Sequence, residues 1–344
     1  MFDTGWTGKS VVLFEDTVKK LNLKIVPTEN TSLVNGSAPL GLTAKYNFSF
    51  LGHEDMIDFY ILKVPDMIKS DGDGVLPYPT VAHLVWAFDL SHGLFSAVVE
   101  SPTNLHDFIS AKIVQDPSKI LTLEVPAGGK TLAVAVDTGK DSGVSLPREE
   151  FEAWLAKHPK SRLTVDAGYT AGIGLEVKRL VWADEFKIGD LILHDIPLTE
   201  TGKAEIANAP GAYCFLGLFA VSRLSMILDG PHSIAYLAPS QSKPFSFTHN
   251  RLGAVFVPVG NDSDDLTAFV AKGSPADLAG IMDGDLLLAI DKQDVTKWRS
   301  VPGILPFSRF WSMPAGSKHK LTLKRGTKII RIKVVLKDIL APTH

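Results

Sequence analysis

The tripeptide Asp-Thr-Gly occurs twice in this chain, beginning at Asp3 and at Asp137. The second copy follows the apolar run 132–136, which is typical of a buried strand. A carboxylate on a tight turn at the end of such a strand is poorly solvated, and two facing carboxylates cannot both ionise cheaply. If the two turns face each other, their carboxyl groups share one proton, and such a pair is suited to activating a water molecule.

The tripeptide by itself is a weak signal, because turns rich in Asp and Gly are common. A third match to the looser pattern Asp-(Ser/Thr)-Gly begins at Asp141. The residues around the tripeptides must therefore carry the argument, and an internal repeat is the first feature to look for.

The stretches that follow Asp3 and Asp137 repeat each other. In both, small and polar residues give way to Val and Leu, and then to a charged, helix-forming stretch. Leu21 and Leu155 each stand 18 residues after their aspartate. This spacing, together with the preceding strand, favours Asp137 over Asp141 as the partner of Asp3.

A second match lies downstream in both copies. Two apolar residues precede Pro77 in the first copy and Gly217 in the second. Pro77 to Asp89 and Gly217 to Asp229 are both 12 residues, and each aspartate is followed by a turn and an apolar strand. The chain is therefore predicted to contain a duplicated body.

This pattern resembles the pepsin and retropepsin superfamily of aspartic proteases, and most of all the bacterial retropepsin-like group that carries a PDZ domain. The resemblance covers roughly residues 1–240. It implies a mainly β fold with a two-lobed β-barrel body built by internal duplication, and an aspartic endopeptidase activity that needs no cofactor and no metal. The implied catalytic pair is Asp3 and Asp137, and the implied supporting residues are Thr4, Gly5, Thr138, Gly139 and Gly217.

The last hundred residues resemble a bacterial PDZ domain of the α+β class. Pro275 is suited to the first turn of a short helix, and Arg325-Gly326 joins two alternating strands. The resemblance implies a loop whose main-chain amides hold the C-terminus of a peptide, formed by Leu252, Gly253, Ala254, Val255 and Phe256. A docking domain without a free ligand is the alternative, because Pro302 and Pro306 oppose a long groove helix.

These features predict three domains: a first protease-like lobe at 1–100, whose N-terminal strands are missing, a second lobe at 101–243, and a PDZ domain at 244–344. The second lobe opens with a predicted hairpin, 120–125 and 131–136, that the first lobe lacks. Because the chain opens almost on the first tripeptide, either its start lies upstream or the first lobe is degenerate. We expect a periplasmic or extracellular protein in the first case and a cytoplasmic one otherwise.

Three residues argue against full activity, and one of them is Trp6, which follows the first tripeptide where the superfamily usually has a small or hydroxyl residue. Pro77 stands where the superfamily has a glycine, so a close approach of main chain would be lost. Lys140 follows the second tripeptide, and an ammonium group near the pair favours two ionised carboxylates, unless it points to solvent. Two hypotheses follow: a peptidase that acts on peptides or unfolded proteins, or an impaired protease fold that binds peptides.

Composition excludes several classes of function. The chain has 344 residues, of which 45% are hydrophobic and 21% charged, so a substantial core is expected. Its net charge is −3 without a basic block, which makes nucleic acid an unexpected partner. Cys214 is the one cysteine, so no disulfide forms within the chain, and no apolar run reaches the length of a membrane span.

Overall fold

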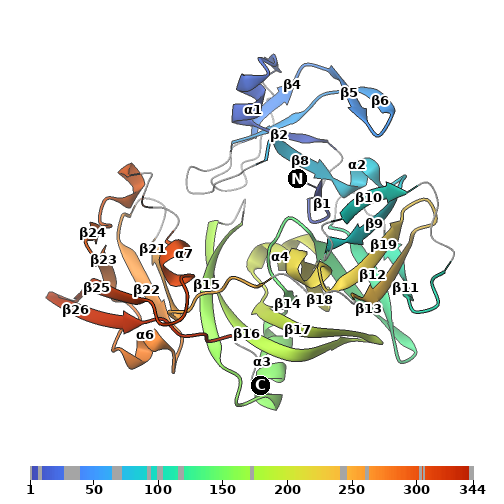
Figure 1. Cartoon of the computed structure of the whole chain (residues 1–344). Helices are drawn as coiled ribbons and strands as arrows, with labels where there is room; N and C mark the ends of the chain where they lie inside the picture. The colour runs from blue at the N-terminus through green and yellow to red at the C-terminus, as the bar shows by residue number, and fades with distance from the viewer. Residues whose placement is uncertain are drawn as a thin grey trace.

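The chain folds into a mainly β structure (Figure 1). The computed structural model describes residues 2–6, 10–26, 39–63, 72–90, 94–98, 104–114, 120–170, 174–240, 246–259, 263–301, 304 and 307–340. Within these ranges, three open sheets contain most of the strands, and the helices are short. The prediction of a mainly β protein is therefore confirmed.

The first sheet belongs to the first copy of the repeat and has the strand order β1-β8-β2-β7-β4-β3. Its strands are β1 (Phe2–Asp3), β2 (Val12–Phe14), β3 (Ile25–Val26), β4 (Pro39–Thr43), β7 (Tyr60–Leu62) and β8 (Gly74–Pro77). Helices α1 (Glu15–Lys20) and α2 (Tyr78–Val81) and a separate hairpin of β5 (Tyr46–Phe50) and β6 (His53–Ile57) complete this copy. Acidic residues in the first turn of α1 and lysines in its last turn suit the helix dipole.

The second sheet is larger and joins strands from both copies, in the order β10-β9-β19-β20-β11-β12-β13-β18-β14-β17-β16-β15. From the first copy come β9 (Val85–Asp89) and β10 (Leu94–Val98). The others are β11 (Ile109–Val114), β12 (Thr122–Ala127), β13 (Lys130–Asp137), β14 (Val144–Leu146), β15 (Leu163–Thr170), β16 (Gly174–Ile188), β17 (Leu191–Glu200), β18 (Cys214–Gly217), β19 (Leu224–Asp229) and β20 (Ile234–Pro239). Helices α3 (Arg148–Lys157), α4 (Lys203–Asn208) and α5 (Leu218–Val221) lie between these strands in the sequence.

One strand order occurs twice. The neighbours β1-β8-β2-β7 in the first copy match β13-β18-β14-β17 in the second, and the pairs run parallel, antiparallel and parallel in both. The register matches too, because Asp3 pairs with Pro77 and Asp137 pairs with Gly217. The residues that the sequence repeat aligns therefore occupy equivalent places.

Strands β9 and β19 join the two copies by antiparallel pairing, in which Phe88 lies opposite Met226 and Trp86 opposite Leu228. Trp86 also anchors the short first strand, because its ring centroid lies 5.3 Å from that of Phe2. Phe95 packs on the same ring at 4.7 Å. This aromatic cluster holds β1 against strands β9 and β10.

A separate core lies in the C-terminal part of the chain. Its sheet has the order β21-β22-β23-β25-β26, with β24 paired to β23. Its elements are β21 (Ala254–Pro258), β22 (Leu266–Val270), α6 (Pro275–Leu278), β23 (Leu286–Ile290), β24 (Gln293–Asp294), a 3-10 turn (Trp298–Ser300), α7 (Ser308–Trp311), β25 (Lys318–Arg325) and β26 (Lys328–Val335). Pro275 opens α6 as expected. In the stretch 301–312, the described residues include the four-residue α7, and Pro302 and Pro306 lie outside the described residues.

The C-terminal unit packs against the outer strand β15 of the large sheet (Figure 1). Val165 of β15 is buried with Val255 of β21, and the Thr164 hydroxyl donates to the Asn250 carbonyl at 2.9 Å. The last described residues, Ile339 and Leu340, return to the large sheet and are buried there. The unit is therefore fixed on the second copy.

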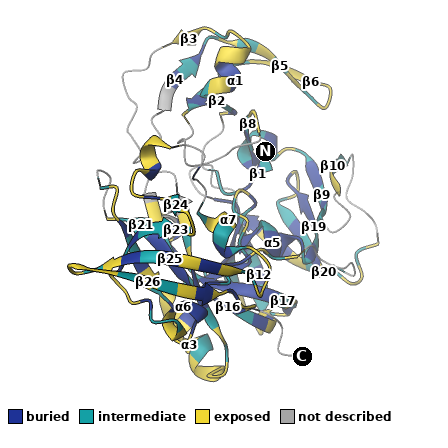
Figure 2. Cartoon of the chain, turned by 60° about the vertical axis from the view of Figure 1, so that its left-hand side comes forward, coloured by how far each residue is buried: buried dark blue, intermediate teal, exposed yellow. Residues whose placement is uncertain are grey.

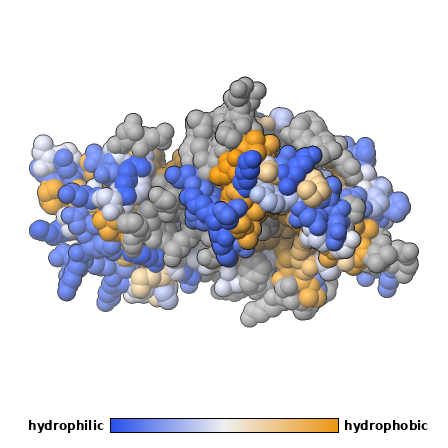
Figure 3. All heavy atoms as spheres, turned by 90° about the horizontal axis from the view of Figure 1, so that it is seen from above, coloured by the Kyte–Doolittle hydropathy of each residue, from blue (hydrophilic) through white to orange (hydrophobic). Residues whose placement is uncertain are grey.

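The central strands and the outer hairpin differ in how far their residues are buried. In Figure 2 the central strands of the large sheet are mostly buried, whereas the β5–β6 hairpin is largely exposed. Seen from above, apolar surface lies between hydrophilic side chains (Figure 3).

Among the described residues, no helix combines the length and apolar character needed to cross a bilayer, as predicted.

Candidate active site

The two Asp-Thr-Gly loops meet where β1 and β13 end. A methyl carbon placed on Gly5 would stand 2.8 Å from Asp137 Oδ2 and closer still to its other oxygen. A methyl carbon on Gly139 would stand 2.8 Å from Asp3 Oδ1 and again closer to its other oxygen. Each carboxyl group therefore lies against the glycine of the opposite loop, which only a residue without a side chain permits.

Two threonines join the loops by reciprocal hydrogen bonds. The Thr4 amide donates to Thr138 Oγ1 at 3.1 Å, and the Thr138 amide donates to Thr4 Oγ1 at 3.0 Å. Each hydroxyl then donates to a carbonyl of the opposite strand, Thr4 to Val136 at 2.8 Å and Thr138 to Phe2 at 3.1 Å. Both threonines are buried, so these bonds are shielded from competition by water.

Each aspartate also accepts a hydrogen bond within its own loop. The Gly5 amide donates to Asp3 Oδ1 at 2.7 Å, and the Gly139 amide donates to Asp137 Oδ1 at 3.1 Å. These bonds fix one oxygen of each carboxyl group and stabilise its charged form. The sequence-predicted residues from both tripeptides are therefore all at one place in the fold.

Burial dominates the electrostatics of the pair. Burial first, and then the nearby Asp3 carboxylate, raise the pKa of Asp137 to about 7 against the opposing charge of Lys140. Burial also raises the pKa of Asp3, against the amide hydrogen bonds that lower it. At mildly acidic pH the arrangement therefore retains a proton, and one carboxyl group is available as an acid beside one carboxylate.

Lys140 is neither directed to solvent nor paired with the two aspartates. Its ammonium group donates to Ser145 Oγ at 3.2 Å and forms an ion pair with Glu205. Glu205 also accepts from Lys178 at 2.9 Å and from the Gly202 amide at 2.6 Å. Lys140 therefore does not simply point to solvent, because a buried carboxylate binds it. Its charge still lowers the pKa of Asp137, in the direction that the sequence led us to expect.

The pKa values of Lys140 and Glu205 are both shifted from their ordinary values. Burial lowers the pKa of the Lys140 ammonium. Burial opposes ionisation of Glu205, but the charges of Lys140 and Lys178 outweigh it and lower the pKa of Glu205 to about 2. Sequence reasoning missed Glu205 and Lys178, and no motif or regular spacing identifies them.

Gly217 and Pro77 lie beside the two aspartates in the sheet. A methyl carbon on Gly217 would collide with the main chain and hydroxyl of Ser142, so its close approach is to the loop after Asp137 rather than to the carboxylates. Pro77 occupies the matching register position beside Asp3 and leads directly into α2. The substitution of glycine by proline is therefore accommodated in the first copy.

The predicted carboxylate-binding loop of the C-terminal unit is already occupied. Asn250 Oδ1 accepts the amides of Leu252 at 2.9 Å and Gly253 at 3.0 Å. Ala254, Val255 and Phe256 are buried, and Val255 packs against β15. These contacts give no support to peptide binding at residues 252–256.

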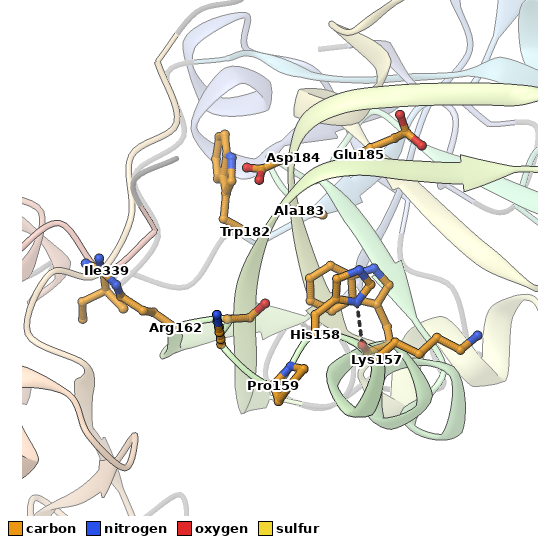
Figure 4. A pocket seen from close by; sticks show the side chains of 12 residues that line it. Lys157, His158, Pro159, Arg162, Trp182, Ala183, Asp184, Glu185 and Ile339 are labelled. Carbon is orange, nitrogen blue, oxygen red and sulfur yellow. Dashed lines mark hydrogen bonds between the residues drawn. The ribbon is translucent and has the colours of Figure 1, made fainter. Parts of the chain in front are cut away.

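A hollow of about 540 Å³ lies elsewhere, between the C-terminal end of α3 and strand β16 (Figure 4). Trp154 and His158 stack on one side with ring centroids 4.0 Å apart, and Trp182 and Ile339 contribute to the other sides. No residue of the two tripeptides lines it.

Among the described residues, no group of three His, Cys, Asp or Glu side chains is arranged to hold a metal ion.

Comparison of the chain with models of known protein families and with curated proteins found no match.

Proposed function

We propose that this protein is an aspartic endopeptidase that hydrolyses peptide bonds with a water molecule held between Asp3 and Asp137. The supporting observation is the contact of each carboxyl group with the opposite glycine, braced by the reciprocal bonds of Thr4 and Thr138. A structural role alone does not account for this placement, because burying two carboxyl groups side by side is costly unless one stays protonated.

The pair would act by general acid–base catalysis. One carboxylate accepts a proton from water as the water oxygen attacks the carbonyl carbon of the peptide, while the protonated carboxyl group donates to the carbonyl oxygen. The tetrahedral intermediate then collapses, the carbon–nitrogen bond breaks, and the amine leaves with a proton returned from the pair. Because the two groups titrate together, neither aspartate is assigned as the initial base.

We further propose that the architecture is that of a two-lobed pepsin-like or retropepsin-like body, with lobes at 1–100 and 101–243, followed by a PDZ domain at 244–344. The recurring strand order and the pairing of β9 with β19 support the two related lobes. The separate core of residues 252–336 supports the third domain. Its contacts with β15 favour a domain docked on the second lobe over one that recruits peptides.

Cleavage of an unfolded protein by the purified chain between pH 4 and 7 tests the activity. We expect cleavage that is lost in Asp3→Asn and in Asp137→Asn. Asp141→Asn is the matched control, because Asp141 starts the third Asp-(Ser/Thr)-Gly tripeptide but is exposed, and it should retain activity. Equal activity in all three variants would reject the assignment.

A second measurement on the same proteins distinguishes a peptidase from a peptide-binding protein with an impaired site. A peptide that carries a hydroxymethylene group in place of the scissile amide resembles the tetrahedral intermediate and should bind the wild-type protein but not Asp137→Asn. Binding of this compound without any cleavage at any pH would indicate a peptide-binding protein with an impaired site.

A further inference from the structure

The residue after the second Asp-Thr-Gly poses an electrostatic problem for the proposed chemistry. Lys140 is half-buried, with its side chain 23% exposed, and its charge acts on Asp137 in the direction of ionisation. An unbalanced ammonium group beside two carboxyl groups favours the doubly ionised pair, which has no proton to donate to a carbonyl oxygen. A working pair therefore needs a group that holds and balances this ammonium.

Glu205 has the position for that task. Its two oxygens are divided between Lys140 on one side and Lys178 on the other, and its side chain is only 8% exposed. The Gly202 amide donates to it at 2.6 Å, because Gly202 is the N-cap of α4 and Glu205 stands three residues after it. The carboxylate is thus fixed by its own helix and cannot follow the lysines if they move.

The other charged groups around the cluster leave it close to balance. Glu176 on β16 and the Lys178 ammonium both lie against Gly202, where a methyl carbon would meet them. Asp166 on β15 interacts with Lys178 and with Asp141. The positive charges of Lys140 and Lys178 are therefore balanced by the negative charges of Glu205 and Glu176. The charged groups that act on Asp137 are Asp3, Lys140 and Glu205.

We propose that Glu205 is a positioning residue of the proposed peptidase, which holds the Lys140 ammonium on Ser145 and neutralises it, so that Asp3 and Asp137 keep one shared proton. This inference rests on the proposed function for its meaning. Its physical content, a charge balance at Asp137, is measurable whether or not the protein cleaves peptides. Ser145 is fully buried, so the lysine is held between two fixed partners rather than by a surface contact.

The test is a carbon-13 NMR titration of the aspartate carboxyl groups in the full chain, with the Asp137 signal assigned by its loss in Asp137→Asn. Glu205→Gln leaves the ammonium unbalanced, and the Asp137 midpoint should fall by about one pH unit. Lys140→Met leaves the Glu205 carboxylate without one of its two cations, and the Asp137 midpoint should rise by a similar amount. The double variant should return close to the wild-type midpoint.

Opposite shifts in the two single variants are the signature, since a general loss of packing would move both midpoints in the same direction. Amide NMR spectra check that each variant is folded, and Lys140→Met still tests the charge balance if Glu205→Gln unfolds. If peptide cleavage is detected, the alkaline limb of its pH profile should move down in Glu205→Gln and up in Lys140→Met. If the Asp137 midpoint is unchanged in both variants, or shifts in the same direction in both, the inference is overturned. If the midpoint shifts in opposite directions but no peptide is cleaved, only the proposed function is rejected.

Discussion

Thr4 and Thr138 donate their main-chain amides to each other's hydroxyl oxygens, at 3.1 and 3.0 Å, across a sequence separation of 134 residues. This reciprocal pair holds the two aspartates in a fixed relation, because each threonine follows its aspartate directly. The bond pattern is nearly symmetric, as expected where two copies of one loop meet. Its symmetry extends to the hydroxyl donors, which both reach a carbonyl of the opposite strand.

Replacing one hydroxyl should therefore destabilise the whole fold. Thr138→Val keeps the shape of the side chain but leaves the Thr4 amide and the Phe2 carbonyl without their partner. Each unsatisfied buried group costs about 1–3 kcal/mol, so we expect a loss of about 3 kcal/mol in the free energy of unfolding, measured by urea denaturation. Thr138→Ser retains the oxygen and should lose much less. Equal losses in the two variants would mean that the methyl group, not the hydroxyl, is what matters.

The close approach of each carboxyl group to the opposite glycine gives a second prediction. In Gly139→Ala the new methyl carbon would stand 2.7 Å from the Asp3 carboxyl carbon, so the carboxyl group must move away from Asp137. Displacement of a reacting group by about 1 Å costs on the order of 100-fold in rate, and we expect at least that loss in kcat/KM on a peptide substrate. Gly168→Ala on β15 is the control, because no atom lies within 4 Å of its added methyl carbon. A loss of the same size in both variants would argue against a specific contact.

Much of this site was predictable from the repeat. The spacing of Leu21 and Leu155 identified Asp137 rather than Asp141 as the partner of Asp3, and the structure brings Asp3 and Asp137 together while Asp141 is exposed. The repeat succeeded because strand, turn and helix are local features, and a duplicated chain places equivalent turns about a common axis. For the same reason, the mainly β class was predictable from apolar runs and turn residues.

The charges around the site were not predictable in this way. Glu205 lies 65 residues from Lys140 in sequence, and it meets Lys140 only because α4 lies against the loop after Asp137 and against Lys178 of β16. Lys178 is of a residue type that is almost never fully buried unless paired, yet it is buried here beside Glu205. Such contacts depend on how loops of different length pack in each copy, and a repeat carries no information about the parts that differ.

The C-terminal unit gives a third prediction, from Asn250. Its side-chain carbonyl accepts two buried amides, and its side-chain amide donates to the Ala254 carbonyl at 2.8 Å. Asn250→Ala leaves these groups unpaired and should lower the free energy of unfolding by about 2–4 kcal/mol. Asn104 is exposed, so the control variant Asn104→Ala should have a free energy of unfolding within about 0.5 kcal/mol of the wild type. Thermal denaturation measures both. A peptide with a free C-terminus should not protect the wild-type unit, and saturable binding at this loop would contradict the assignment of the amides to Asn250.

The raised pKa values of the two aspartates predict a pH dependence of stability with a definite sign. The pKa of Asp137 rises from its ordinary 3.8 to about 7 in the folded protein, chiefly through burial, so the folded state holds a proton that the unfolded state has released. Its contribution to stability is complete below about pH 4 and is lost as the pH rises to about 7. Over this window the slope for one group is at most about 1.4 kcal/mol per pH unit.

Comparison of the wild type with Asp137→Asn isolates this contribution, since other groups titrate in both proteins. Among these, burial lowers the pKa of His249, so its contribution to stability increases as the pH rises toward 6.5 and opposes that of the aspartates. We therefore expect the wild type to lose stability relative to Asp137→Asn between pH 4 and 7, measured by urea denaturation at each pH. Asp141→Asn should follow the wild type throughout. A difference between wild type and Asp137→Asn that stays constant over this range would show that the two carboxyl groups do not hold a proton in the folded protein.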